Sequence, residues 1–328
     1  MHIGSGKNNK LLYYLRGFAR EAVPDGIFRR RLRRALASVE DRPDRDYIFD
    51  RVNYYCRLEV PTELPATAPT LGEHSRKGAP SVYYFDTKEY TRWFDPRLRW
   101  EHRFGDVTFV PEVPAIVKSR PIGGDNANSV LLNLDKVRHF TFLKDTVPFR
   151  EKSDRAVFRG HIGGKPHRRR FMEMYYGSEV CDCGIIPSGP GFPAEWLRPK
   201  ISLWEHLRYK FVMALEGNDV ASNLKWIMSS ASLAVMPKPK YETWFMEGRL
   251  EPGRHYVEIR DDYSDLPEKI AYYSAHPEAA EEIIRCAHEY VGQFFDRRRE
   301  RLIALSVLDK YFRMTGQTSG STGSEVKM

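Results

Sequence analysis

The apolar positions of the first 60 residues follow helical spacing. Phe28, Leu32, Ala35 and Leu36 recur on one face, and five arginines fill the positions between them, at 29, 30, 31, 33 and 34. This pattern is typical of an amphipathic helix. A basic amphipathic helix lies either in a membrane interface or against its own protein with a solvated basic face. The pattern leaves both interpretations open.

The middle of the chain changes to short apolar runs that suit strands. Residues 61–79 are rich in Pro, Thr, Ala and Gly and predict a loop. The runs that follow predict strands at SVYYFD (81–86), at two places in DVTFVPEVPAIVKSRPI (106–122), at SVLLNLD (129–135) and at AVFRG (156–160). Because these runs alternate with helical segments, we expect parallel βα units rather than a β-sandwich.

The second half shows a clearer order of elements. SLWEHLRYK (202–210) predicts a helix that leads into the strand FVMALE (211–216), followed by a helix from about Val220 to Ser230 and the strand SLAVM (232–236). Together they predict a βαβ unit. HYVEI (255–259) predicts a further strand, and 265–312 predicts a long helical tract interrupted near Pro277. The polar tail after it is predicted to be disordered.

Length and charge narrow the class of protein. The 328 residues allow two ordinary domains. Residues 1–40 hold nine Lys/Arg and three Asp/Glu, so they carry +6 of the net charge of +8. The nearly neutral remainder disfavours a nucleic-acid-binding protein, whose basic surface usually extends along the binding face. A basic N-terminal segment suits an anionic surface better.

Cysteine usage and hydropathy favour a cytoplasmic protein. Four cysteines in a chain of this length do not predict a disulfide framework, so we expect free thiols in a reducing compartment. No run approaches the roughly 18–20 apolar residues of a membrane span. The N-terminus has neither a continuous apolar region nor a small-residue cleavage site, so it does not predict a secretion signal.

A polar, glycine-containing turn separates two of the predicted strands. It lies at the carboxyl end of one strand and the start of the next helix, where open α/β sheets bind phosphates. Gly217 allows close approach of the backbone, Asn218 and Asp219 can cap the helix, and Ser222 adds a hydroxyl. Lys225 is expected to reach either a phosphate or solvent. An ordinary turn would have the same composition.

A second glycine loop lies in VFRGHIGGKPHRRR (157–170). It is not a P-loop, because three residues separate its outer glycines where four are needed, and Pro166 replaces the Ser/Thr that binds magnesium. Arg159 can hold a diphosphate through its two-pronged guanidinium, unless the segment is simply a basic surface loop. His161 and His167 have no third ligand at a suggestive spacing, so no metal site is expected.

Two carboxylates, Asp86 and Glu242, are candidate functional groups. Asp86 ends a predicted strand and is a candidate general base. Competitors in the same region are Asp95, Glu101 and Asp106. In PKYETWFMEG (239–248), Glu242 can accept hydrogen bonds from a ribose, while Trp244 and Phe245 equally suit the core. The motifs of serine hydrolases, zinc proteases and metal-dependent transferases with a DxD triplet are absent from the sequence.

Three segments together resemble glycosyltransferase family 90: VFRG, the stretch from Leu203 to Gly248, and HYVEIRDDYSDL (255–266). This family includes bacterial lipopolysaccharide core glycosyltransferases, fungal capsule xylosyltransferases and animal protein O-glucosyltransferases. The resemblance covers roughly residues 80–312, is closest to the bacterial group and is most specific in 200–266. It implies a GT-B architecture, in which two Rossmann-like domains face a cleft.

The implied domains follow the chain in order. Residues 1–60 form a basic helical segment, and 61–150 with part of the C-terminal helices form the acceptor-side domain. Residues 151–312 bind the nucleotide-sugar, and 313–328 form a disordered tail. The resemblance also implies inverting transfer from a UDP-sugar without a metal or other cofactor.

The donor-binding residues are carried over position by position. Arg159 and Gly160 match the family's RG pair near the diphosphate, and 217–225 match its donor-binding turn and helix. Asn223 aligns with an arginine of the animal members, so Lys225 and Arg159 are expected to neutralise the diphosphate instead.

The acceptor side is carried over in the same way. The family's catalytic aspartate follows a strand in the N-terminal half, and Asp86 fits that description best, with Asp106 in reserve. VKSRPI matches a cleft-lining segment, which makes Lys118 and Arg120 expected contacts. The implied function is transfer of a hexose to lipopolysaccharide or lipooligosaccharide core, by a cytoplasmic enzyme bound to the anionic inner-membrane surface through its N-terminal basic helix. Transfer to another surface polysaccharide, or non-catalytic nucleotide-sugar binding, stays open.

Overall fold

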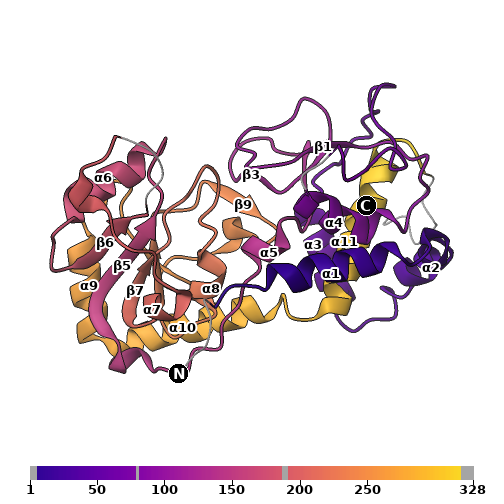
Figure 1. The fold of residues 1–328 in the computed structure, drawn as a ribbon. Helices are drawn as coiled ribbons and strands as arrows, with labels where there is room; N and C mark the ends of the chain where they lie inside the picture. Colours follow the sequence, from indigo (N-terminus) through magenta and orange to yellow (C-terminus); the bar gives the residue numbers. More distant parts are fainter. Residues whose placement is uncertain (1–5, 79–80, 187–190, 319–328) are drawn as a thin grey trace. The chain divides into compact units, whose positions relative to one another are not determined.

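The chain divides into two compact units, which we describe separately. The computed structural model describes residues 6–78, 81–186 and 191–318. One unit joins the residues up to 10 with 137–295 and contains a five-stranded sheet, whereas the other joins 11–136 with the chain from 296 onward and contains a three-stranded sheet (Figure 1). We call them the five-stranded unit and the three-stranded unit. The domain boundaries expected from the sequence stay predictions.

All strand pairs of the five-stranded sheet are parallel, and their spatial order is β10-β8-β7-β5-β6. The bounds are β5 (Ser153–Gly160), β6 (Cys181–Ile185), β7 (Tyr209–Met213), β8 (Leu233–Met236) and β10 (Val257–Glu258). Numbered along the chain, these strands have the order 2-1-3-4-5 of a doubly wound sheet. The strand order therefore reverses between β5 and β7, which is where such sheets bind ligands.

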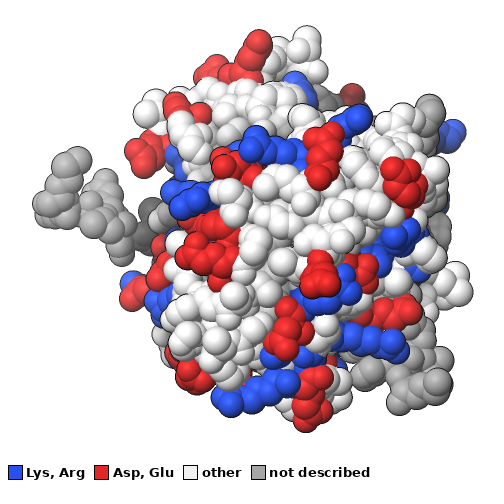
Figure 2. Space-filling view, turned by 90° about the vertical axis from the view of Figure 1, so that its left-hand side faces the viewer, with Lys and Arg blue, Asp and Glu red and all other residues white. Residues whose placement is uncertain are grey.

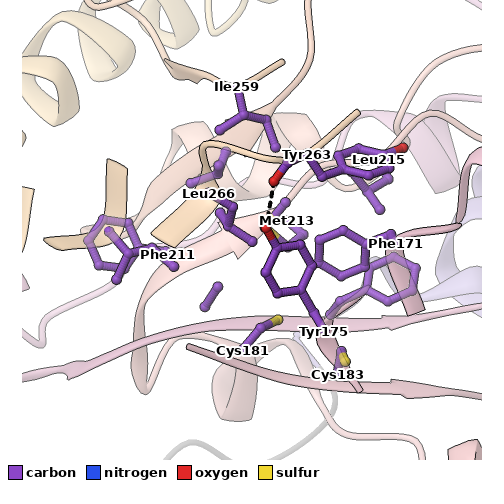
Figure 3. Packing of buried hydrophobic residues seen from close by; sticks show 14 of the residues in the cluster. Phe171, Tyr175, Cys181, Cys183, Phe211, Met213, Leu215, Ile259, Tyr263 and Leu266 are labelled. Carbon is purple, nitrogen blue, oxygen red and sulfur yellow. Dashed lines mark hydrogen bonds between the residues drawn. The ribbon is translucent and has the colours of Figure 1, made fainter. Parts of the chain in front are cut away.

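Helices flank this sheet and enclose one apolar core. They are α5 (Lys136–His139), α6 (Pro166–Tyr175), α7 (Leu203–His206), α8 (Leu224–Met228), α9 (Leu266–Ala275) and α10 (Pro277–Gly292), with short turns η1 (Phe149–Glu151), η2 (Ala194–Trp196) and η3 (Glu247–Arg249) and the strand β9 (Tyr241–Thr243). Figure 3 shows Phe171 and Tyr175 of α6 close to Tyr263, with Phe211 and Met213 of β7 in the same buried cluster. The Tyr175 hydroxyl donates to the Tyr263 carbonyl at 2.5 Å, so its polar end is satisfied inside the core.

The predicted βαβ unit is confirmed, but its helix is shorter than expected. The helix forms only over α8, because residues 217–223 stay in a turn. The Asn223 side chain donates to the Met213 carbonyl at 2.9 Å and so ties this turn to the end of β7. The helical tract breaks where predicted, since α9 ends at Ala275 and α10 begins at Pro277.

The three-stranded sheet is parallel, in the order β1-β2-β4. Its unit contains β1 (Glu101–Arg103), β2 (Ala115–Val117), β3 (Ser119–Pro121), β4 (Ser129–Leu131), α1 (Lys10–Glu21), α2 (Asp25–Ala37), α3 (Arg45–Tyr55), α4 (Ser81–Thr91) and α11 (Arg297–Met314). The fully buried Arg51 of α3 pairs with Glu300 of α11, so the C-terminal helix belongs to this unit's core. The predicted tail lies mostly outside the described residues.

The strand predicted at 81–86 is wrong, because this segment begins the helix α4. Its aromatic side chains are buried on different sides: the Phe85 and Phe18 ring centroids lie 5.1 Å apart, and Tyr83 stacks on Phe104 at 5.0 Å. A helix that is apolar all round has no amphipathic period, and over six residues it resembles a strand. Residues 106–110 are also not a strand, whereas 115–117 and 129–131 are.

The observed fold is thus a mixed α/β architecture with parallel sheets. None of the helices in the described ranges combines the length and apolar character of a membrane span. All four cysteines are free and buried, as expected. On the face drawn in Figure 2, acidic and basic side chains are interspersed, which agrees with a nearly neutral body.

Candidate functional site

Two glycine-containing loops meet at the switch point of the five-stranded sheet. One follows β5 (160–165) and the other follows β7 (214–223), and both were selected from the sequence. Their strands are adjacent and parallel, so both loops leave the same edge of the sheet. A Cβ at Gly160 would lie 3.0 Å from the Phe158 ring, so a larger residue here would require that ring to shift.

Arg168, which the sequence analysis passed over, joins these two loops. Its Nε donates to the Glu216 carbonyl at 2.7 Å, its Nη2 to the Leu215 carbonyl at 2.6 Å and its Nη1 to the His161 carbonyl at 2.9 Å. Among the described residues no carboxylate forms an ion pair with it. Burial lowers the pKa of Arg168 to about 10, which is the effect expected of a partly desolvated cation without a counter-charge. Two of its five N–H groups remain for a ligand.

Glu216 extends this connection to a third loop. Its carboxylate accepts the backbone N–H groups of Lys240 and Tyr241, at 2.8 and 3.3 Å, in the loop that follows β8. Burial raises the pKa of Glu216 to about 7, and the two backbone donors only partly offset that rise. The His167 ring bonds the Glu216 carbonyl at 2.9 Å. The loops after three neighbouring strands are therefore held together by Arg168 and Glu216.

The turn after β7 is ordered mainly by its own backbone. The Gly217 N–H donates to the Asp219 carbonyl at 3.1 Å, which folds the turn back on itself. Asn218 is exposed at its tip, Ser222 is partly exposed and Asp219 is buried. Asn223 is also partly exposed, but its side chain is bonded to β7. The donor-binding role of these residues stays a prediction.

Arg159 lies on the sheet face opposite the aromatic core and is matched by a carboxylate. Its Nη2 lies 2.7 Å from Asp182 of β6, its side chain is only 7% exposed, and Asp182 also accepts the Tyr209 hydroxyl. The role expected for Arg159 beside a diphosphate stays a prediction, and a diphosphate would compete with this ion pair.

Lys225 does not reach solvent, and its expected role beside a diphosphate stays a prediction. It is fully buried, and its Nζ lies 2.5 Å from Glu247 Oε1, which belongs to η3. Glu247 also accepts the Thr243 N–H at 2.7 Å, so the ion pair joins α8 to β9. Glu242 is likewise fully buried rather than open to a ribose. Trp244 and Phe245 are buried, which confirms the core interpretation of these aromatics.

Asp86 does not follow a strand and has no exposed surface. It lies within α4, accepts the Tyr13 hydroxyl at 2.8 Å and the Lys136 N–H at 2.9 Å, and has the Lys136 ammonium at 3.5 Å. Burial raises the pKa of Asp86, although the Lys136 charge opposes the shift. This environment is typical of a structural carboxylate, because a base must reach the hydroxyl that it deprotonates.

Asp106, unlike Asp86, follows a strand in the N-terminal half, as expected of the catalytic aspartate. It follows β1 by three residues, and its side chain is 22% exposed. Lys118, which directly follows β2, places its Nζ 2.5 Å from Asp106 Oδ1. Because β1 and β2 are parallel, both residues belong to the same edge of the three-stranded sheet.

A second acidic residue, Asp135, follows β4, the remaining strand of the three-stranded sheet. Asp135 comes after β4 with a φ of 53°, a conformation that non-glycine residues rarely adopt. Burial raises the pKa of Tyr83, which lies within electrostatic range of Lys118, Asp135 and Asp106. Arg120, by contrast, is fully buried and donates to the carbonyls of Tyr54 and Ser129 at 2.7 and 3.0 Å, so it supports the fold rather than a surface.

No set of three or more His, Cys, Asp or Glu side chains within the described ranges is arranged to hold a metal ion. The absence of a metal from the reaction stays a prediction.

Comparison with known proteins decides the family. The sequence profile of glycosyl transferase family 90 matches residues 133–315, more than half of the chain. O-glucosyltransferase LpsA of Dichelobacter nodosus is 47% identical over 265 residues, which are 81% of this chain and 82% of that protein. The chain belongs to glycosyltransferase family 90.

Animal proteins are also similar to this chain, at lower identity. Protein O-glucosyltransferase 3 of Homo sapiens is 26% identical over 49% of this chain and 32% of its own length. Protein O-glucosyltransferase 2 of Danio rerio is 28% identical over 27% of this chain and 18% of its own. The expected resemblance is thereby confirmed. The chain is an enzyme, a glycosyltransferase, and its relatives support the hexosyltransferase class.

The family match covers the two glycine loops and reaches only the end of the three-stranded sheet region. It includes β5, Arg168, Glu216 and the turn after β7, but Asp106 and Lys118 precede it. The family profile therefore includes the residues at the carboxyl edge of the five-stranded sheet. It begins after β4, so the profile does not support a role for Asp106 and Lys118, which are selected here from their geometry.

Proposed function

We propose that this chain transfers a hexose, with glucose as the leading candidate, from a UDP-sugar to the core of lipopolysaccharide or lipooligosaccharide, with inversion and without a metal. The observation that carries this proposal is the 47% identity to a protein named O-glucosyltransferase, which extends over four-fifths of both chains. We further propose that the two units act as the Rossmann-like halves of a GT-B enzyme.

The five-stranded unit is the proposed donor side. Without a metal, the departing diphosphate must be stabilised by cations and backbone dipoles. Arg168 suits this task better than Arg159 or Lys225, because each of the latter is neutralised by a carboxylate, Asp182 or Glu247. Arg168 also lies at the switch point, where doubly wound sheets bind nucleotides.

The three-stranded unit is the proposed acceptor side, with Asp106 as the general base in place of Asp86. An inverting transfer needs one carboxylate that takes the proton of the attacking hydroxyl. Asp106 follows a strand and is partly exposed, and Lys118 fixes its orientation. Asp86 is enclosed by Tyr13 and Lys136, so a sugar hydroxyl cannot reach it without local opening.

The proposed location is the cytoplasmic face of the inner membrane, because a lipid-linked acceptor is presented there. The basic charge of the first 40 residues suits such a surface.

The test is a transfer assay with purified protein, UDP-glucose and delipidated core oligosaccharide. We expect a glucosylated product with inverted anomeric configuration, formed at the same rate with and without EDTA. A screen of other UDP- and GDP-sugars by thermal shift identifies the preferred donor. Failure of every UDP-sugar to stabilise the protein or to yield product would overturn the proposal, and a rate that EDTA abolishes would overturn its metal-independent form.

A further inference from the structure

The N-terminal helix α1 exposes an aliphatic and aromatic stripe. Leu11, Leu15 and Phe18 are exposed by 69%, 55% and 47%, and their spacing places them on one helical face. Six of the fourteen exposed large hydrophobic residues in the described ranges fall within 11–27: Leu11, Leu12, Leu15, Phe18, Val23 and Ile27. A concentration of this kind marks an interaction surface rather than random surface composition.

The opposite side of α1 is fixed on the three-stranded unit, so the stripe has a defined direction. The Tyr13 hydroxyl donates to Asp86 and to the Val82 carbonyl, at 2.8 and 3.1 Å. A Cβ at Gly17 would come within 2.6 Å of the Phe85 ring, so α1 and α4 pack in very close contact there. These contacts hold α1 with its leucines facing away from α4.

The following helix, α2, supplies charge rather than apolar surface. Its apolar face is partly covered, since Phe28 contacts Trp93 with ring centroids 5.2 Å apart and Arg92 lies 4.1 Å from the Phe28 ring centroid. The arginines at 29, 30, 31, 33 and 34 are all exposed and form no ion pair with any residue that the structure describes. The acidic residues on either side in sequence are already paired, Asp25 with Lys88 and Arg92, and Glu40 with Arg45.

We propose that α1 inserts Leu11 and Leu15 into the interface of an anionic phospholipid bilayer while the arginines of α2 bind the headgroups. Phe18 lies at the border of this surface, because its ring also contacts Phe85 of α4. The two helices are joined by only three residues, and together they offer the two components of interfacial binding: exposed apolar side chains and excess positive charge. This proposal deepens the membrane association in the proposed function by assigning insertion to α1 instead of α2.

The first experiment measures co-sedimentation with phosphatidylglycerol vesicles and with neutral phosphatidylcholine vesicles. We expect Leu11→Glu combined with Leu15→Glu to weaken binding to the anionic vesicles about tenfold or more, because each buried methylene contributes to insertion. Val60→Glu is the matched control, since Val60 is 72% exposed in a loop of the same unit, and it should bind as the wild type does. Replacing the five arginines of α2 with glutamine should also weaken binding, and more so at low salt.

A second experiment does not depend on how the glutamate variants fold. All four native cysteines are buried, so a single introduced cysteine can be labelled selectively with an environment-sensitive fluorophore. The fluorescence emission of a label at Leu11→Cys should shift to shorter wavelength on addition of anionic vesicles, whereas the emission of a label at Val60→Cys should not.

Equal vesicle binding by the double glutamate variant and the wild type, or no shift at Leu11→Cys, overturns the assignment to α1. No vesicle binding by the wild type also overturns it and indicates a protein partner for this surface. Transfer to delipidated oligosaccharide is measured in parallel and needs no membrane, so a failure of the proposed enzymatic function shows there and is distinguishable.

Discussion

The two units place opposite charges at the carboxyl edges of their parallel sheets. In the five-stranded unit the charge is a guanidinium, Arg168, which is held by backbone carbonyls and matched by no described carboxylate. In the three-stranded unit it is a carboxylate, Asp106, that already has a cation, Lys118. A cation without a counter-charge can take up the charge of a leaving diphosphate, whereas a carboxylate held by a lysine is oriented to accept a proton.

Removing the carboxylate of the three-stranded unit tests whether Asp106 is the general base. We expect Asp106→Asn to lower kcat by about 10²–10⁴-fold, the usual contribution of a general base, with UDP affinity unchanged. The matched variant is Asp86→Asn, which we expect to reduce stability more than turnover, because Asp86 is buried beside Lys136. Turnover by both variants is measured with oligosaccharide acceptor. Near-normal activity of Asp106→Asn would exclude Asp106 as the base.

The second variant tests whether Lys225 is structural. Lys225→Met leaves Glu247 buried without its ammonium partner, so we expect the free energy of unfolding to fall by about 3–5 kcal/mol. The double variant Lys225→Met with Glu247→Gln should recover much of this loss. Denaturant unfolding measures both. If Lys225→Met keeps its stability but loses UDP affinity, Lys225 binds the donor and is not merely structural.

The third variant removes the unmatched cation of the five-stranded unit. We expect Arg168→Gln to weaken UDP binding by about 1–3 kcal/mol, the range for charge-assisted hydrogen bonds. Arg169→Gln, which removes an exposed arginine paired with Glu173, should leave affinity unchanged. Isothermal titration calorimetry with UDP distinguishes them. Equal affinity of the two variants would contradict the assignment of Arg168.

The fourth prediction concerns Glu216, whose pKa is raised to about 7 by burial. A carboxyl group whose pKa is higher in the folded than in the unfolded protein loses its stabilising contribution as pH rises from the unfolded value through 7. The free energy of unfolding of the wild type should therefore fall between pH 5 and pH 8, whereas that of Glu216→Gln should not. We expect the difference between the two proteins to change by about 1–3 kcal/mol in favour of the variant over this range. Denaturant unfolding at both pH values checks this. A pH-independent difference would mean that Glu216 titrates normally.

The last prediction concerns His74 of the three-stranded unit, whose protonation changes stability in the opposite sense to that of Glu216. Burial, followed by the charges of His102 and Lys88, lowers the pKa of His74 to about 4. The unfolded chain therefore binds the proton first, and stability falls as pH drops from 6.5 toward 4. We expect His74→Phe to remove about 1–3 kcal/mol of this decline, the same range as for Glu216. An unchanged pH profile of the unfolding free energy would contradict it.

The sequence was most informative where strands are fully buried and end in glycine turns. β7, β8 and the glycine turn between them were predicted, because uninterrupted apolar runs beside Gly217 leave little choice of structure. In the three-stranded unit the strands have three residues each, too few for a periodic signal, and α4 is buried on all sides. Asp106 was therefore kept in reserve, because the strand that precedes it was not recognised.

Arg168 could not be selected from the sequence for a different reason. It is the fourth residue of KPHRRR (165–170), where basic residues are frequent, and its neighbours Arg169 and Arg170 are exposed. What distinguishes it is contact with three main-chain carbonyls, and main-chain atoms leave no trace in residue identity. The only available signal was its place in the first turn of a helix after a glycine loop.

That same dependence on main-chain atoms bears on how this enzyme can diversify. Arg168 donates to the main-chain carbonyls at positions 161, 215 and 216, so the exposed side chain at 161 can be exchanged without loss of these hydrogen bonds. The scaffold of the loops is thereby separated from the chemical groups that they display. Substitution at exposed positions of these loops can therefore change the groups offered to a ligand while the main-chain frame stays constant.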